Sequence, residues 1–148
     1  MRIIVDADAC PGREYIEKAA KENNNIEVIM YSDINHVINS NYSIVKIVDS
    51  GFQSVDMKVA NETARGDIVV TQDYGVAAMV LGKKAYAISP KGYIYSNDNI
   101  DRLLFERHIS SKVRRSGGKT SNPKKRTEED NERLYRNLLK LIKNASKG

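Results

Sequence analysis

The sequence is poor in the residues that cross-link proteins covalently or bind soft metals. Among its 148 residues there is one cysteine, Cys10, and there are two histidines, His36 and His108, which are isolated along the chain. One cysteine excludes an internal disulfide framework and is typical of a reducing cytoplasm. Without His or Cys pairs, the chain also lacks the usual ligands of zinc. We therefore expect a cytoplasmic protein with no structural zinc.

Long hydrophobic runs are also absent. No apolar run approaches the length of a membrane span, so we expect no membrane association. The first apolar residues, Ile3 to Val5, follow Met1 so closely that we expect no signal peptide. A hydrophobic content of 41% and a charged content of 29% are ordinary for a globular domain of this length.

Positive and negative charges are divided unevenly along the chain. Residues 1–101 contain ten Lys and Arg against fourteen Asp and Glu, whereas residues 102–148 contain fourteen against five. An acidic first part joined to a basic second part indicates a polyanionic partner, and nucleic acid fits this description. The alternative is that the basic part is only a solvated surface.

Apolar runs and helical patterns alternate along the chain. This order predicts an α/β fold, a three-layer sandwich with a mainly parallel central sheet and right-handed crossovers, plus C-terminal helices. Residues 1–115 are expected to form one α/β domain, and residues 116–148 a basic loop and a C-terminal helix packed on the same domain. The predicted strands are 3–5, 26–31, 42–48, 67–71, 85–89 and 92–95, and the predicted helices are 12–23, 55–65, 74–81, 97–114 and a last one from 127.

Carboxylates follow several of the predicted strands. Asp6 and Asp8 come after the first strand, Asp49 after the third and Asp73 after the fourth, while Asp56 opens the helix that follows the third strand. Because parallel strands end at one edge of the sheet, these side chains are expected to lie near one another. Charges this close repel each other unless a cation or a proton intervenes, so without metal at least one of these acids should have a raised pKa. The alternative is that they cap helices and stabilise turns.

This pattern predicts a divalent-metal site at the sheet edge. Carboxylates without histidine or cysteine pairs suit a hard cation, Mg²⁺ or Mn²⁺, which can activate water and stabilise the charge on a phosphodiester during cleavage. The expected metal ligands and catalytic residues are Asp6, Asp8, Asp56 and Asp73. The expected supporting residues around them are Asp49, Ser50 and Thr71.

Basic residues of the second part are candidates for binding phosphates, and the expected partner is single-stranded or structured RNA. They are Arg102, Arg107, Lys112, Arg114, Arg115, Lys119, Lys124, Lys125 and Arg126. Tyr93 and Tyr95, which precede this region, could stack on bases, although alternation within a strand explains them equally well.

Two resemblances accompany these motifs. The order of Ile-Val-Asp-x-Asp, Asp56 at a helix start and Val-Val-Thr-Gln-Asp73 resembles a PIN-type nuclease domain, which implies a PIN-like fold and metal-dependent cleavage of RNA. Over nearly the whole chain, the sequence resembles the YaiI/YqxD family of uncharacterised bacterial proteins. The segments that carry this second resemblance are Asp6-Ala7-Asp8-Ala9-Cys10-Pro11, Thr71-Gln72-Asp73 and Ser116-Gly117-Gly118-Lys119-Thr120 with Pro123.

The sequence thus predicts a divalent-metal-dependent nuclease acting on RNA. One alternative is a non-catalytic nucleic-acid-binding or regulatory protein on a PIN-like scaffold. A further alternative is a phosphatase with an aspartyl nucleophile, for which Ser32 would supply the hydroxyl after the second strand and Asp73 a later metal-binding acid.

Overall fold

A computed structural model describes residues 1–49, 54–117 and 125–147, and within them six strands form a single sheet. The strand order is β3-β2-β1-β4-β5-β6, and all neighbours are parallel except β5 and β6, which are antiparallel. The predicted mainly parallel sheet is therefore confirmed. The strands are β1 (Ile3–Asp6), β2 (Val28–Asp33), β3 (Ile44–Val48), β4 (Ile68–Val70), β5 (Tyr86–Ile88) and β6 (Ile94–Tyr95).

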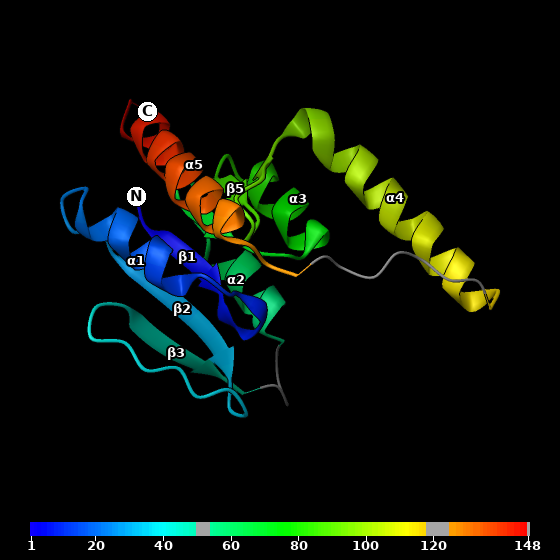
Figure 1. Cartoon of the computed structure of the whole chain (residues 1–148), viewed down its shortest axis with the longest axis horizontal. Helices are drawn as coiled ribbons and strands as arrows, with labels where there is room; N and C mark the ends of the chain where they lie inside the picture. The colour runs from blue at the N-terminus through cyan, green and yellow to red at the C-terminus, as the bar shows by residue number, and fades with distance from the viewer. Residues whose placement is uncertain (50–53, 118–124, 148) are drawn as a thin grey trace.

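Helices cover both faces of the sheet, which confirms the three-layer architecture (Figure 1). In β1, Ile3 and Val5 pack into the core on the side of α1 and α5, and Ile4 packs into the core on the side of α2 and α3. All three are fully buried, as expected for a strand in the middle of a parallel sheet. The helices are α1 (Arg13–Lys21), α2 (Val55–Glu62), α3 (Tyr74–Gly82), α4 (Asn97–Arg115) and α5 (Glu128–Lys147), and a short 3-10 turn, η1 (Ala7–Ala9), follows β1.

The last helix, α5, packs against α1 and the sheet. Leu134, Leu138, Leu141 and Ile142 recur at helical spacing on one face and are all buried. Thr127 and Asp130 cap the start of the helix, because the Thr127 hydroxyl accepts the Asp130 backbone N–H at 3.3 Å and Asp130 Oδ2 accepts the Thr127 backbone N–H at 2.9 Å. The apolar face of α5 thus completes the core on this side of the sheet.

The long helix α4 begins on the body and then projects away from it (Figure 1). Its start is fixed by a capping box between Ser96 and Asn99. Ile100 is buried against α3, whereas Phe105 and Ile109 further along are 64% and 43% exposed. The second half of α4 therefore extends as a solvated arm. Among the described residues, no helix is long and apolar enough to cross a bilayer.

Candidate metal centre

A cavity of about 510 Å³ opens at the edge of the sheet where the parallel strands end. It brings together the four acids that the sequence singled out as ligands. Its lining residues are Asp6, Asp8, Asp33, Ser54, Val55, Asp56, Gln72, Asp73, Tyr74 and Arg107. Acids that are up to 67 positions apart in the chain thus line the same cavity.

Each of the four acids is held by a different local structure. Asp6 is the last residue of β1, Asp8 lies in the 3-10 turn η1, and Asp56 is in the first turn of α2. Asp73 caps α3 by accepting a hydrogen bond of 3.1 Å from the backbone N–H of Val76. Capping and pocket lining are therefore compatible at Asp73, because a carboxylate has two oxygens.

Asp6 is an acid whose charged form the site disfavours. Burial raises its pKa from an ordinary value of 3.8 to about 6, and the nearby charges of Asp8, Asp56 and Asp73 add to this rise. The hydroxyl of Thr71 donates to Asp6 Oδ2 at 3.2 Å and acts in the opposite direction. The raised pKa expected of a crowded, metal-free carboxylate cluster is found at Asp6.

Asp33 is a member of this site that the sequence prediction missed. It is the last residue of β2, next to β1 in the sheet, and its backbone N–H donates to Asp8 Oδ1 at 2.9 Å. The signal that could have found it is the one used for the other acids, a carboxylate at the end of a parallel strand.

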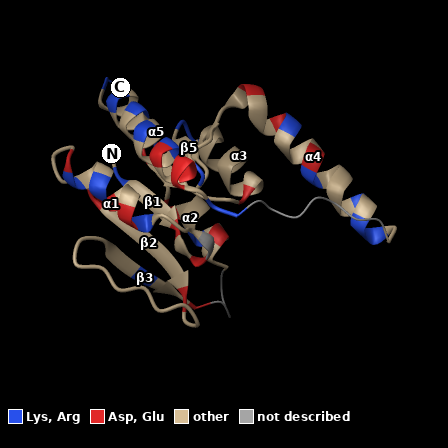
Figure 2. Ribbon diagram, in the orientation of Figure 1, with Lys and Arg blue, Asp and Glu red and all other residues tan. Residues whose placement is uncertain are grey.

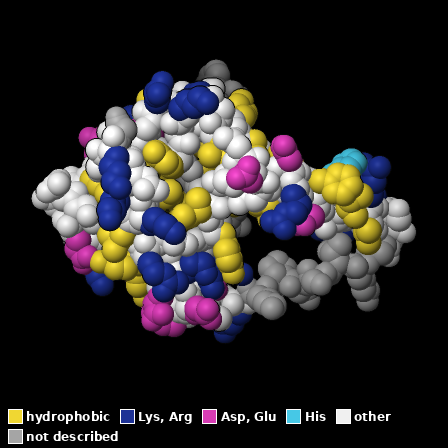
Figure 3. Space-filling view, turned by 90° about the horizontal axis from the view of Figure 1, so that it is seen from above, with side chains coloured by type: hydrophobic (Ala, Val, Ile, Leu, Met, Phe, Trp, Pro, Cys, Tyr) yellow, Lys and Arg dark blue, Asp and Glu magenta, His cyan; other side chains and the backbone are white. Residues whose placement is uncertain are grey.

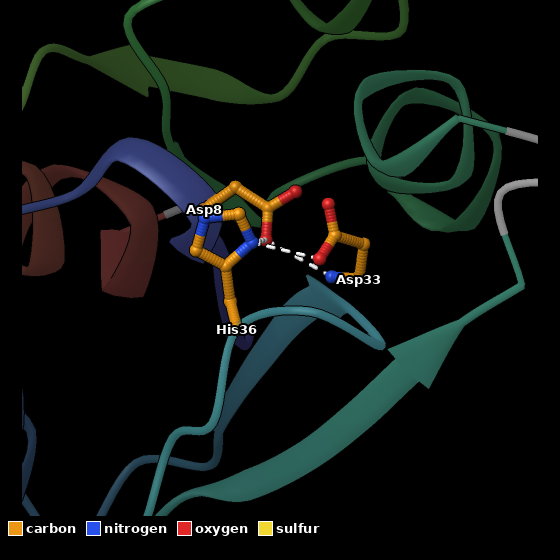
Figure 4. Close-up of side chains that lie close together, drawn as sticks. All are labelled: Asp8, Asp33 and His36. Carbon is orange, nitrogen blue, oxygen red and sulfur yellow. Dashed lines mark hydrogen bonds and ion pairs between the residues drawn. The ribbon is translucent and has the colours of Figure 1, made fainter.

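His36 is not isolated, contrary to the sequence-based expectation (Figure 4). Its Nδ1 lies 2.7 Å from Asp33 Oδ1 and 3.5 Å from Asp8 Oδ1. The hydrogen bond to Asp33 raises the pKa of His36 and lowers that of Asp33. One donor atom from each of Asp8, Asp33 and His36 lies within 4.8 Å of the others, so these three residues together could hold an ion. The turn after β2 brings this imidazole beside Asp8 and Asp33, two of the acids that line the cavity, although His36 itself is exposed and is not one of the residues that line it.

The residues that were predicted to support the metal ligands differ in their burial and in their distance from the cavity. Thr71 is buried and bonded to Asp6, whereas Asp49 is exposed and is not among the described residues that line the cavity. The reason for the position of Asp49 is that β3 is the outermost strand, with β2 between it and β1. Ser50 lies outside the described residues.

Ser32, the hydroxyl that a phosphatase would need, is buried with 1% exposure. Its Oγ has no hydrogen-bond partner among the described residues, and Ser32 is absent from those that line the cavity. The hydroxyl is therefore not presented where the carboxylates converge.

The predicted phosphate-gripping residues lie mostly on α4. Arg107 lines the cavity, with its Nη1 3.8 Å from Asp73 Oδ1. The ribbon in Figure 2 marks further basic positions toward the far end of α4, and Figure 3 shows basic and hydrophobic side chains side by side on the projecting part. The exposed basic residues of this group are Arg102, Arg107, Lys112, Arg114, Arg115 and Lys125, while Lys119 and Lys124 lie outside the described residues.

Arg126 is placed differently from the others. Its guanidinium donates to the Pro90 carbonyl at 2.7 Å and to Asn131 Oδ1 at 2.7 Å. It also lies against Gly12, whose φ of +85° and lack of a side chain make room for it. These contacts join the start of α5 to the body, so Arg126 acts here as a structural residue.

Comparisons with known proteins agree on one family. The family model described as "Uncharacterized BCR, YaiI/YqxD family" matches residues 4–144. The chain is 74% identical to a UPF0178 protein of Clostridium novyi, over 98% of this chain and 97% of that protein. It is 71% identical to a UPF0178 protein of Clostridium tetani, over 99% and 100%, and 53% identical to one of Ruminiclostridium cellulolyticum, over 100% and 96%. No solved structure matches the chain.

Proposed function

We propose that the chain, which belongs to the YaiI/YqxD family, is a divalent-metal-dependent nuclease acting on RNA. The observation that carries this proposal is the convergence of Asp6, Asp8, Asp56 and Asp73 on one cavity. Helix capping explains one such acid, but it does not explain why four separate elements direct carboxylates to the same space.

The donor set fits a hard divalent cation. Carboxylate oxygens are the preferred protein ligands of Mg²⁺ and Mn²⁺, and a cation here would offset the burial and the neighbouring negative charges that raise the pKa of Asp6. The imidazole of His36, near Asp8 and Asp33, would add a nitrogen ligand to this set, which favours Mn²⁺ over Mg²⁺ because imidazole is a softer ligand. When bound, such an ion supplies an activated water and stabilises the charge that develops on a phosphodiester.

The chain's own residues orient the site and attract the substrate. Thr71 holds Asp6 through its hydroxyl and receives the backbone N–H of Asp73 at 3.0 Å, which fixes the ends of β1 and β4 relative to each other. Arg107 at the cavity offers a cation to a phosphate beside the carboxylates. The basic arm of α4 extends this positive surface beyond the cavity.

The basic arm also favours a second candidate function, an RNA-binding protein that does not cleave. Its exposed cations project from the body and do not need the carboxylates in order to contact phosphates. Phosphate contacts supply affinity without base specificity, so binding and cleavage can be separated by experiment.

The test is cleavage of labelled single-stranded RNA in Mn²⁺ by wild type, Asp6→Asn, Asp73→Asn and Asp98→Asn. Asp98 is an exposed acid in the first turn of α4 and is the matched control. Loss of a residue that only supports a metal ligand costs about 10–100-fold, so the first two variants should lose more than about 100-fold. The control should cleave as wild type does.

Two outcomes contradict the proposal. Equal cleavage by all four proteins identifies a contaminating nuclease. RNA binding without cleavage in any of the proteins supports the non-catalytic candidate.

A further inference from the structure

A second cavity, of about 460 Å³, adjoins the carboxylate cavity and shares Gln72 and Tyr74 with it. Its volume is in the range of roughly 300–1,000 Å³ that small-ligand sites occupy. Its walls differ from those of the first cavity, because they contain no carboxylate and include three tyrosines, two prolines and one leucine. The residues that matter here are Gln72, Tyr74, Ser89, Tyr93, Tyr95 and Leu103.

The aromatic walls are held firmly on one side. Tyr95 is 5% exposed, its hydroxyl donates to the Thr71 carbonyl at 3.1 Å, and its ring meets that of Tyr74 edge to face with centroids 5.8 Å apart. Because the Thr71 hydroxyl bonds to Asp6, one residue connects the aromatic wall to the carboxylate site. The two cavities are therefore parts of one rigid arrangement.

Tyr93 forms the exposed side of the same cavity. Its side chain is 55% exposed, and the guanidinium carbon of Arg133 lies 4.4 Å from its ring centroid. A large aromatic ring in this position loses packing energy to water unless a ligand covers it. Arg133, which also donates to Asp130 Oδ1 at 2.8 Å, lies over this ring and restrains its position.

We propose that this second cavity is a nucleobase subsite, which takes the base of the nucleotide whose phosphate lies at the carboxylates. The inference rests on the proposed function, because that function places a phosphodiester in the adjoining cavity. A nucleotide joins a charged phosphate to a flat aromatic base through one sugar, and the two cavities present the matching surfaces side by side.

The polar groups of the subsite suit the edge of a base. Gln72 carries an amide that can both donate and accept, and it lies between the two cavities. Ser89 accepts the backbone N–H of Tyr93 at 3.0 Å, and its hydroxyl still has a proton to donate. Stacking on tyrosine tolerates any base, whereas these few hydrogen-bonding groups permit a moderate preference.

The test is direct binding of small probes to the intact protein in Mg²⁺, followed by ligand-observed NMR. The probes are AMP, UMP, ribose 5-phosphate and inorganic phosphate, titrated to millimolar concentration. Stacking of one base on an aromatic residue corresponds to about a tenfold gain in affinity, so a nucleotide should bind about tenfold more tightly than ribose 5-phosphate. Tyr93→Ala should abolish this difference, and Tyr93→Phe, which keeps the ring, should preserve it.

The outcomes separate this inference from the proposed function. Asp73→Asn should weaken binding of all phosphate probes but keep the ratio between AMP and ribose 5-phosphate. A preserved ratio in a protein that never cleaves RNA would retain the subsite and remove the nuclease proposal. Equal affinity for AMP and ribose 5-phosphate in wild type, or a ratio unchanged by Tyr93→Ala, overturns the subsite even if cleavage is observed.

Discussion

Thr71 donates its side-chain hydroxyl to Asp6 Oδ2 at 3.2 Å, across the parallel pair formed by β1 and β4. Thr71 is fully buried and lies just after β4, and Asp6 is the last residue of β1. This hydrogen bond stabilises the charged form of Asp6, which burial and three neighbouring carboxylates disfavour. Thr71 therefore orients Asp6 and opposes the effect of burial on its pKa.

Replacing Thr71 by valine should weaken metal binding without removing a ligand. Without the hydroxyl, the pKa of Asp6 rises further and the side chain loses its orientation, so we expect Mn²⁺ affinity to fall by about 10–100-fold. Isothermal titration at pH 7 measures this directly. Thr71→Ser, which keeps the hydroxyl, is the matched control, and equal losses in both variants would assign the effect to packing.

Asp6→Asn should stabilise the metal-free protein in a pH-dependent way. The pKa of Asp6 is raised in the folded chain, so the folded state retains a proton that the unfolded state has lost between about pH 4 and 6, and the wild-type protein loses stability as pH rises through this interval. The full rise corresponds to about 3 kcal/mol, and because Asp6 is partly exposed we expect about 1–2 kcal/mol.

Urea denaturation in EDTA at several pH values checks this expectation. The advantage of Asp6→Asn over wild type should grow between about pH 4 and 6 and stay constant above that. An advantage that is the same at every pH would mean that the Asp6 carboxyl has an ordinary pKa.

His36→Gln should change metal preference more than metal binding as a whole. The imidazole Nδ1 is 3.5 Å from Asp8 Oδ1, and nitrogen ligands favour Mn²⁺ over Mg²⁺. Thermal shifts with each ion should show the Mn²⁺ stabilisation reduced while the Mg²⁺ stabilisation stays near that of wild type. Comparable loss for both ions would mean that His36 does not select between them, and no loss for either ion would place His36 outside the metal environment. His108→Gln, an exposed histidine on α4, is the control.

RNA binding should depend steeply on salt, and the basic arm should account for part of that dependence. Each phosphate contact to a single strand contributes about 0.7 to the slope of log affinity against log salt, so Lys112→Gln with Arg115→Gln should reduce the slope by about 1.4. Fluorescence anisotropy between low and physiological salt provides the measurement. A double variant with an unchanged slope would mean that α4 does not contact the RNA backbone.

Most of the candidate site could be predicted because the rule that places it is local. A buried apolar run such as Ile3 to Val5, followed by a carboxylate, identifies the end of a parallel strand, and all such ends share one edge. This rule was sufficient to predict that Asp6 and Asp73 lie at that edge. The same rule also identifies Asp33, the last residue of β2, to which it was not applied, while the supporting role of Asp49 stays a prediction.

The sequence alone thus determined the layers of the fold and the edge at which the acids gather. Both follow from short stretches of sequence, because the spacing of apolar residues and an acid after a strand can each be recognised from neighbouring residues. Only the tertiary structure decided which strands are adjacent. Since β2 lies beside β1 and β3 lies outermost, Asp33 and His36 reach Asp8 while Asp49 stays at the exposed margin. Strand order follows from pairing between distant segments, and no local pattern records it.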